Sequence, residues 1–354
     1  MRGEVPTDRP AGTAMPAGSS RWADRGREAS GEPAGSLSAP FATPSVYCPF
    51  LPTISPHAAS VQRLAVHWAT RHGFLPDART RAAFASAKFA LLMARTYPEA
   101  SEADLALATA WLTVTFRLDD TLETVFGHEP ERLRGVASAI VAYLRGEAVD
   151  LSYRELGPIG GALGDVWRRT RALTGPAWQE RFIGHVAEYL SGNVWEATNR
   201  LTGHRPGPEE YRRMRRHSAA TGMFFDLIEP LRHVELPVEV LADPDFADLR
   251  GHADNAVAWF NDLVSWPKEQ AAGDRHNLVL VLREARELSI VDALYTAVAE
   301  HDAAVHAFLE ARQRVLTGPH RDVDGLAGVV ADLAHWIRGN IDWSQESGRY
   351  GGES

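Results

Sequence analysis

The stretch NDLVSWPKE, residues 261–269, is the part of the sequence from which the rest of the chain is best interpreted. Within it, Asn261, Ser265 and Glu269 recur at intervals of four residues. Because four residues advance an α-helix about 40° beyond one full turn, these oxygen-bearing side chains fall along one face. Oxygen ligands of mixed charge suit a hard divalent cation such as Mg2+. Lys268 adds a positive charge that an anionic ligand could use.

A second set of oxygen donors lies earlier in the chain, at Asp119, Asp120 and Glu123. Their helix is predicted to begin with a capping box at Ser101. Asp119 and Glu123 continue the apolar face of this helix, and Asp120 flanks it. Unpaired carboxylates are unfavourable there, and like charges four residues apart repel each other, so a cation should neutralise them. Salt bridges to arginines, or a position at the mouth of a cavity open to water, are the alternatives to bound metal.

The composition limits the classes of protein to which this chain can belong. Its 354 residues carry a formal net charge of −9, with a pI near 5.9, which argues against nucleic-acid binding. The single cysteine, Cys48, excludes an internal disulfide and a cysteine-based zinc site. No apolar run approaches the roughly 20 residues of a membrane span, and the N-terminus lacks the apolar core of a signal peptide. We therefore expect a cytoplasmic protein without a membrane anchor.

Three regions are predicted along the chain. Residues 1–45, rich in Gly, Ala, Pro, Ser and Arg, are expected to form a disordered leader. Residues 46–350 show long helical patterns and no convincing strand, which predicts a single all-α bundle of about ten helices around a central active-site cavity. Residues 351–354 form a short tail. The expected helices cover 55–73, 79–95, 101–127, 130–145, 158–173, 176–202, 208–232, 245–270, 277–316 and 323–347.

Basic residues that could meet an anionic ligand occur in two places. One predicted helix carries four of them, Arg212, Arg213, Arg215 and Arg216. Most are expected to face solvent, and one or two are expected to point inward, because the helix continues into apolar residues; Gly222 could mark a break there. The other place is the pair at residues 349–350, Arg-Tyr, close to the C-terminus. Arginine offers planar, multiple donors that suit phosphate oxygens.

Together these motifs resemble those of bacterial class I terpene synthases, and the resemblance covers residues 46–350. The acidic triplet at residues 119–123 resembles the aspartate-rich motif in its DDxxE form. Residues 261–269 resemble the NSE motif, the most specific of the set, and residues 349–350 resemble the terminal RY pair. Arg215 stands 46 residues before the asparagine of the NSE-like motif, where this family places its diphosphate-sensing arginine.

The resemblance implies a fold and a reaction. The fold is the α-helical class I isoprenoid synthase bundle, in which three Mg2+ ions bind the diphosphate of a linear prenyl substrate. By resemblance, Asn261, Ser265 and Glu269 hold one ion. Asp119 holds the other two, and Asp120 and Glu123 act in support or in closure of the site.

The resemblance also implies which groups meet the diphosphate. They are Arg215, with Arg216 as the alternative, Lys268, Arg349 and Tyr350. The helix-break position four residues after Arg215, where the family often has glycine, is here Ala219, and its carbonyl group is what would matter.

An apolar, aromatic-lined cavity is expected to protect a carbocation from water. Phe116 lies one turn before the acidic triplet, and Trp343 lies near the C-terminal pair, so both are expected to face this cavity. Phe89 is a weaker candidate of the same kind, as are Trp195, Phe224 and Phe225. For any single aromatic residue, ordinary core packing is the competing interpretation, and it is the favoured one for all but Phe116 and Trp343.

The leading hypothesis is a Mg2+-dependent cyclase that converts farnesyl diphosphate to a sesquiterpene and releases diphosphate. A diterpene cyclase acting on geranylgeranyl diphosphate is the nearest alternative, and a C10 substrate is also open. A chain-elongating prenyltransferase should show a second aspartate-rich motif, and a non-catalytic helical binding protein should show no Mg2+-dependent release of diphosphate. The sequence leaves the product and the oligomeric state open, with a homodimer as one option.

Overall fold

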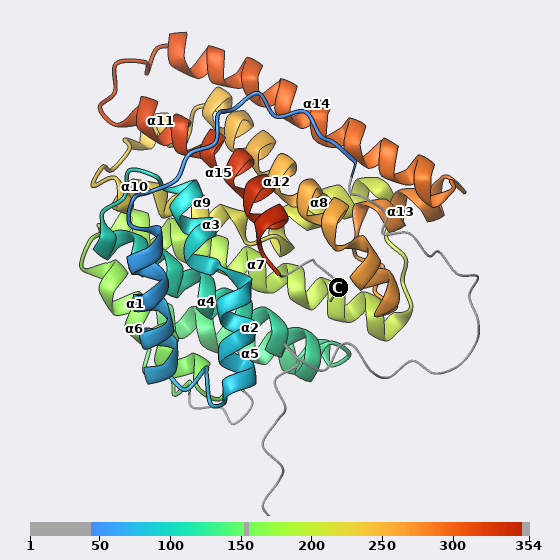
Figure 1. The fold of residues 1–354 in the computed structure, drawn as a ribbon, viewed down its shortest axis with the longest axis horizontal. Coiled ribbons are helices and arrows are strands. Elements are labelled where there is room, and N and C mark those ends of the chain that lie inside the picture. The colour runs from blue at the N-terminus through green and yellow to red at the C-terminus, as the bar shows by residue number, and fades with distance from the viewer. Residues whose placement is uncertain (1–43, 152–155, 349–354) are drawn as a thin grey trace, which may run out of the picture.

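The structure is a computed structural model that describes residues 44–151 and 156–348. Most of the expected leader, and the pair Arg349 and Tyr350, lie outside the described residues. Within them the chain forms α-helices and no strand, which confirms the all-α prediction (Figure 1). The helices of the first half are α1 (Ala58–Arg71), α2 (Ala78–Ala87), α3 (Phe89–Thr96), α4 (Glu102–Phe126), α5 (Pro130–Leu144), α6 (Ile159–Arg171) and α7 (Pro176–Thr202). Those of the second half are α8 (Pro208–Ser218), α9 (Thr221–Asp226), α10 (Ile228–Leu231), α11 (Val238–Leu241), α12 (Pro244–Ala271), α13 (Leu278–Ala285), α14 (Ile290–Thr317) and α15 (Leu326–Glu346).

Two long helices organise the bundle. In the first half, α4 packs against α1, α3, α5, α6 and α7, and in the second half α12 packs against α8, α9, α11, α13, α14 and α15. The helices α7 and α15 connect the halves, since α7 contacts α4, α5, α8 and α9, while α15 contacts α3 as well as α12 (Figure 1). The faces of α4 and α12 that carry the two predicted motifs are thus placed within one bundle.

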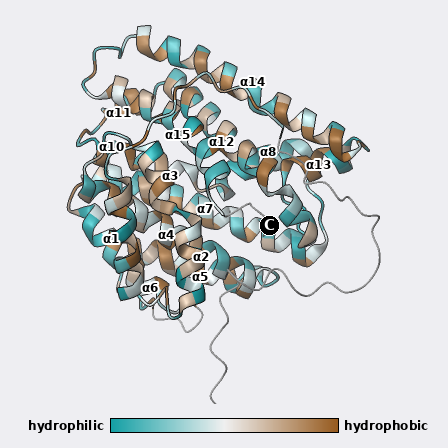
Figure 2. Cartoon of the chain, viewed as in Figure 1, coloured by the Kyte–Doolittle hydropathy of each residue, from teal (hydrophilic) through white to brown (hydrophobic). Residues whose placement is uncertain are grey.

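Local sequence explains where the long helices begin. The Ser101 side chain accepts a hydrogen bond from the backbone N–H of Asp104 at 3.2 Å, so the predicted start of α4 is confirmed. Asp243 caps α12 in the same way, and Pro244 occupies its first turn, where proline is tolerated. The helix α12 continues through Pro267 to Ala271. Along α14 and its neighbours, hydrophobic and hydrophilic residues alternate, as expected of helices with one buried face (Figure 2).

Three predicted helices are broken in the structure, so the described residues form more than the ten helices expected. The 79–95 helix divides at Lys88, the 208–232 helix at Ala219–Ala220, and the 277–316 helix before Ser289. Lys88 has φ 48° and Ala220 has φ 61°, a left-handed backbone conformation that stops an α-helix. The break after α8 therefore precedes Gly222, which lies inside α9.

The core is a continuous layer of aliphatic and aromatic side chains between the helices. Two of its buried indoles donate hydrogen bonds through their N–H groups: Trp111 donates to the Thr170 hydroxyl at 2.8 Å and Trp178 to the Asp226 backbone carbonyl at 3.0 Å. Among the described residues, no helix combines the length and the apolar character that a bilayer span requires.

Candidate functional site

A cavity of about 230 Å3 opens among α4, α7, α8, α9, α12 and α15. One part of its lining is rich in carboxylates, amides and cations, and another part is aliphatic and aromatic. Every predicted site residue within the described part of the chain lines this cavity, with the exception of Phe89, Arg216 and two of the weaker aromatic candidates. The structure therefore brings together residues that are far apart in the sequence.

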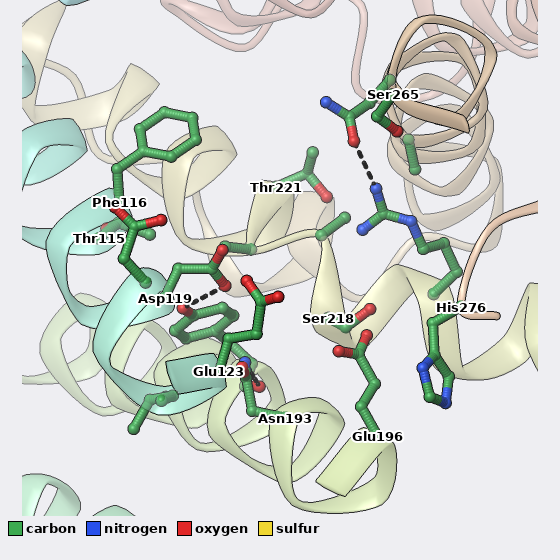
Figure 3. A pocket seen from close by; sticks show the side chains of 18 of the residues that line it. Thr115, Phe116, Asp119, Glu123, Asn193, Glu196, Ser218, Thr221, Ser265 and His276 are labelled. Atoms are coloured by element: carbon green, nitrogen blue, oxygen red, sulfur yellow. Dashed lines mark hydrogen bonds between the residues drawn. The ribbon is translucent and has the colours of Figure 1, made fainter. Parts of the chain in front are cut away.

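The acidic triplet of α4 forms one wall of the cavity. Asp119, Asp120 and Glu123 line it and are half-buried, which matches a position at the mouth of a cavity. The hydroxyl of Tyr189, on α7, donates a hydrogen bond to Oδ1 of Asp119 at 3.1 Å (Figure 3). Burial, with the Asp119 carboxylate as the next cause, raises the pKa of this tyrosine well above its usual value, so the phenol remains a donor.

The oxygen set of α12 forms another wall. Asn261, Ser265 and Glu269 all line the cavity, and Figure 3 shows Ser265 across it from the acidic residues of α4. Burial, reinforced by the charge of Asp262, raises the pKa of Glu269 to about 8. A nearby positive charge would favour its ionised form.

The side chain of Asn277, at the start of α13, forms hydrogen bonds with this oxygen set. Its Nδ2 donates to Oε2 of Glu269 at 2.7 Å, to the backbone carbonyl of Asp262 at 2.8 Å, and more weakly to Oγ of Ser265 at 3.4 Å. Its Oδ1 accepts the N–H of Val279 at 2.9 Å and so caps α13. Asn277 is fully buried, so these bonds are shielded from water. The sequence analysis missed this residue.

Arg215 is the arginine of α8 that reaches the cavity. Its Nε donates to Oδ1 of Asp262 at 2.9 Å and its Nη2 to Oδ1 of Asn261 at 2.8 Å, which fixes the guanidinium beside the α12 set. Lys268 also lines the cavity. Arg216, the chain neighbour of Arg215, donates to Asn255 at 2.8 Å and lines a separate cavity on the other side of the break. The structure therefore places Arg215, and not Arg216, at the α12 oxygen set.

The break between α8 and α9 forms a third part of the wall. Ala219 and Ala220 both line the cavity, and α9 begins directly after them at Thr221. The hydroxyl of Thr221 donates to the half-buried carboxyl group of Asp254 on α12. This contact ties the start of α9 to the neighbouring long helix.

Aromatic side chains surround the other part of the cavity. Phe116, Phe224 and Trp343 line it, as expected. Phe89, contrary to expectation, does not line the cavity, and its ring stacks on that of Phe116 with centroids 4.8 Å apart. Trp195 and Phe225, for which packing was the favoured interpretation, do not line the cavity either. Trp195 donates to Glu210 on α8, and the ring of Phe225 packs against Trp336.

Several lining residues were not assigned to the cavity from the sequence. On α15, Trp336 and Asn340 line the cavity together with Trp343, and the spacing of four and three residues would have placed them on one face. On the polar side, Arg200 bridges Glu196 and Asp274 at 3.2 and 2.7 Å. The spacing of four residues between Glu196 and Arg200 is a local signal for an ion pair on one helix. The contact between Arg200 and Asp274 spans 74 residues, and no local pattern in the sequence indicates it.

Among the described residues, no three histidine, cysteine, aspartate or glutamate side chains converge into a preformed metal site. The oxygen donors instead belong to separate walls and include an amide and a hydroxyl group. Mixed oxygen sets of this kind suit Mg2+, which keeps waters and binds few protein ligands.

Comparison with known proteins gives a consistent set of matches. Residues 110–307 match the family model described as terpene synthase family 2, C-terminal metal binding. The chain is 35% identical over 311 residues to a (+)-T-muurolol synthase ((2E,6E)-farnesyl diphosphate cyclizing) of Roseiflexus castenholzii, which covers 85% of this chain and 92% of that protein. It is 33% identical over 311 residues to a 10-epi-cubebol synthase of Sorangium cellulosum, covering 86% and 97%. The crystal structure of germacradien-4-ol synthase from Streptomyces citricolor superposes with a TM-score of 0.74 at 25% identity, covering 85% of this chain and 100% of that one.

Proposed function

The chain belongs to the terpene synthase family and is a carbon–oxygen lyase with the class I helical fold, and we propose that it ionises and cyclises farnesyl diphosphate to a sesquiterpene with release of diphosphate. The observation that carries the proposal is the division of one cavity into a part rich in oxygen donors and cations and a part lined by aromatic rings. The name of the muurolol synthase, which specifies farnesyl diphosphate, supports the choice of substrate.

The oxygen-rich part fits Mg2+. Asn261, Ser265 and Glu269 present an amide, a hydroxyl and a carboxylate oxygen on one stripe of α12. The raised pKa of Glu269 reflects a half-buried carboxyl group that a cation would stabilise as carboxylate. Asp119 would hold further ions from the wall of α4, giving three in all, with Asp120 and Glu123 beside it. Bound Mg2+ would draw electron density from the diphosphate and so weaken the carbon–oxygen bond.

The residues of the chain then have distinct roles. Arg215, already fixed by Asp262 and Asn261, would donate to diphosphate oxygens, and Lys268 would add a second cation. Arg349 and Tyr350 would contribute further donors from the C-terminus. Donors held in place before the reaction stabilise the developing charge without the energy of reorganisation.

The aromatic part would receive the prenyl chain. Phe116, held flat against Phe89, and Trp343, whose indole N–H is bound to the Ala87 carbonyl at 2.9 Å, present rigid ring faces. Ring faces attract a cation, and an apolar wall excludes the water that would quench it. The carbonyl of Ala219, at the break after α8, would face the substrate from the third wall.

The test is incubation of the purified full chain with C10, C15 and C20 prenyl diphosphates, with and without Mg2+. Diphosphate release and hydrocarbon products are measured by a coupled assay and by gas chromatography with mass spectrometry. We expect Mg2+-dependent cyclic products with the C15 substrate foremost. Asp119→Asn and Asn261→Ala should abolish release while circular dichroism remains unchanged. Asp248→Asn, an exposed carboxylate of α12 outside the cavity, is the matched control and should retain activity. Unchanged activity in both site variants would refute the site, and preference for another chain length would refute the substrate.

A further inference from the structure

One polar side chain stands among the aromatic rings of the cavity and has no part in the proposed function. Asn340 lies on α15 between Trp336 and Trp343, and all three line the cavity. Trp343 neighbours Phe116 with ring centroids 6.4 Å apart, and Trp336 neighbours Phe224 at 5.6 Å. The amide therefore lies on the face of α15 that meets the aromatic rings.

The orientation of this amide is fixed by a single hydrogen bond. Its Nδ2 donates to the backbone carbonyl of Val257 at 3.3 Å, and because a carbonyl can only accept, the nitrogen must be on that side. Oδ1 makes no hydrogen bond to any described residue, and it is not among the fully enclosed polar atoms of the described chain. Since the side chain is only 5% exposed and lines the cavity, Oδ1 opens into the cavity.

An amide oxygen in this place is unfavourable for folding alone. A buried acceptor without a partner loses its hydration and gains nothing in exchange, and an apolar side chain would pack there without that loss. The same oxygen is useful if positive charge comes near it. In a water-excluded cavity the negative end of a fixed dipole attracts a cation more strongly than it would in water.

The contact of Asn340 with α12 indicates where in the cavity that positive charge would lie. Val257 precedes Asn261 by four residues, so the amide of Asn340 lies against α12 about one turn, or roughly 5 Å, from the first of the proposed metal ligands. It is thus set apart from the place where diphosphate would leave, and on the side of the aromatic rings. A cation that forms near the metal ligands and moves into the aromatic part of the cavity would encounter Oδ1 there.

We propose that Asn340 is a specificity-determining residue, whose Oδ1 stabilises one carbocation over its alternatives and so selects the product. This inference rests on the proposed function, because it requires a carbocation in the cavity. It assigns no role to Asn340 in ionisation, which the α4 and α12 residues would perform. Product choice and diphosphate release are therefore expected to separate on substitution.

The experiment compares Asn340→Leu, which removes the amide, with Asn340→Asp, which keeps an acceptor of the same shape. Burial would keep the new carboxyl group protonated, so that it donates to Val257 and presents a carbonyl oxygen to the cavity. With farnesyl diphosphate and Mg2+, the Leu variant should keep diphosphate release within about threefold of wild type, but the share of the main product relative to its side products should fall about tenfold, as for the loss of one electrostatic contact. The Asp variant should restore much of the wild-type profile.

Asn340→Ala serves if the leucine variant does not fold, as judged by circular dichroism and thermal melting. The matched control is Thr109→Val, a buried polar-to-apolar change on α4 whose hydroxyl bonds the Leu105 carbonyl outside the cavity lining, and it should leave the profile unchanged. Unchanged products in the Leu and Ala variants, or an equal change in the control, would overturn the role of Asn340 while leaving the proposed function intact. Absence of diphosphate release from wild type with any prenyl diphosphate would instead overturn the proposed function, and this inference with it.

Discussion

The half-buried carboxyl group of Asp254 should make the stability of this protein fall as the pH rises through mildly acidic values. Asp254 accepts a hydrogen bond from the Thr221 hydroxyl at the break between α8 and α9. Burial is the main cause that raises the pKa of Asp254 from 3.8 to about 6, against the hydrogen bond from Thr221 and the charges of Arg216, Arg215 and Arg250, which lower it.

The direction in which stability changes with pH follows from the number of protons bound in each state. Between pH 3.8 and about 6 the folded protein holds a proton on Asp254 that the unfolded chain has released, so the free energy of unfolding decreases as the pH rises through this window. Below this window Asp254 is protonated in both states, and above it the folded state carries a partly desolvated charge. A difference of about two pKa units corresponds to about 3 kcal/mol, which is the largest effect that this one group can have.

The assay is urea unfolding of wild type and Asp254→Asn between pH 4 and 7.5, followed by circular dichroism at 222 nm. Asparagine keeps an oxygen for the Thr221 hydroxyl but does not titrate. The free energy of unfolding of Asp254→Asn should therefore rise relative to wild type by up to about 3 kcal/mol as the pH increases from 4 to 7. Asp248→Asn, on the same helix, shows whether any aspartate-to-asparagine change produces the trend. A difference between wild type and Asp254→Asn that is flat with pH would show that the group is not desolvated as the structure indicates.

Three further substitutions test the supports of the site. Asn277→Ser keeps a capping oxygen for α13 but loses the donor to Glu269, so the Mg2+ concentration for half-maximal activity should rise about tenfold, and an unchanged value would contradict the support. Tyr189→Phe loses the hydrogen bond to Asp119 and should lower kcat/KM about tenfold with little change in Tm; a normal kcat/KM would show that Asp119 needs no such support. Phe89→Ala removes a buried ring and should destabilise the fold by about 3–5 kcal/mol in urea unfolding, and a loss below about 1 kcal/mol would contradict its packing role.

The long helices could be predicted because their signals are local. A capping serine and a sustained apolar face placed α4 within one residue of its true bounds, and the predicted ranges of α7 and α12 were equally close. The spacing of oxygen-bearing residues then placed Asp119 and Asn261 on cavity-facing sides of their helices. Periodicity alone is sufficient for such features, since a helix fixes the relative directions of its own side chains.

The helix breaks could not be predicted, because the residues that make them carry no local signal. Lys88, Ala220 and Glu287 each adopt positive φ, which L-residues with a Cβ atom avoid, and none is glycine or asparagine. The nearest glycine in one of these segments, Gly222, is helical. The strain at Ala220 is held in place by contacts made elsewhere, among them the hydrogen bond from Thr221 to Asp254, 33 residues away.

The residues that support the site could not be predicted from the sequence for a related reason, and Asn277 shows this reason most clearly. An asparagine before the apolar run at the start of α13 is a recognisable helix cap, so half of its role was open to prediction. The other half depends on α12 and α13 meeting at an angle that brings the side-chain nitrogen of Asn277 within hydrogen-bonding distance of Glu269. One amide thus satisfies a helix terminus through its oxygen and fixes a proposed metal ligand through its nitrogen. Because both tasks use the same buried group, a change that impairs the cap also moves the ligand, and this links the local folding of α13 to the geometry of the active site.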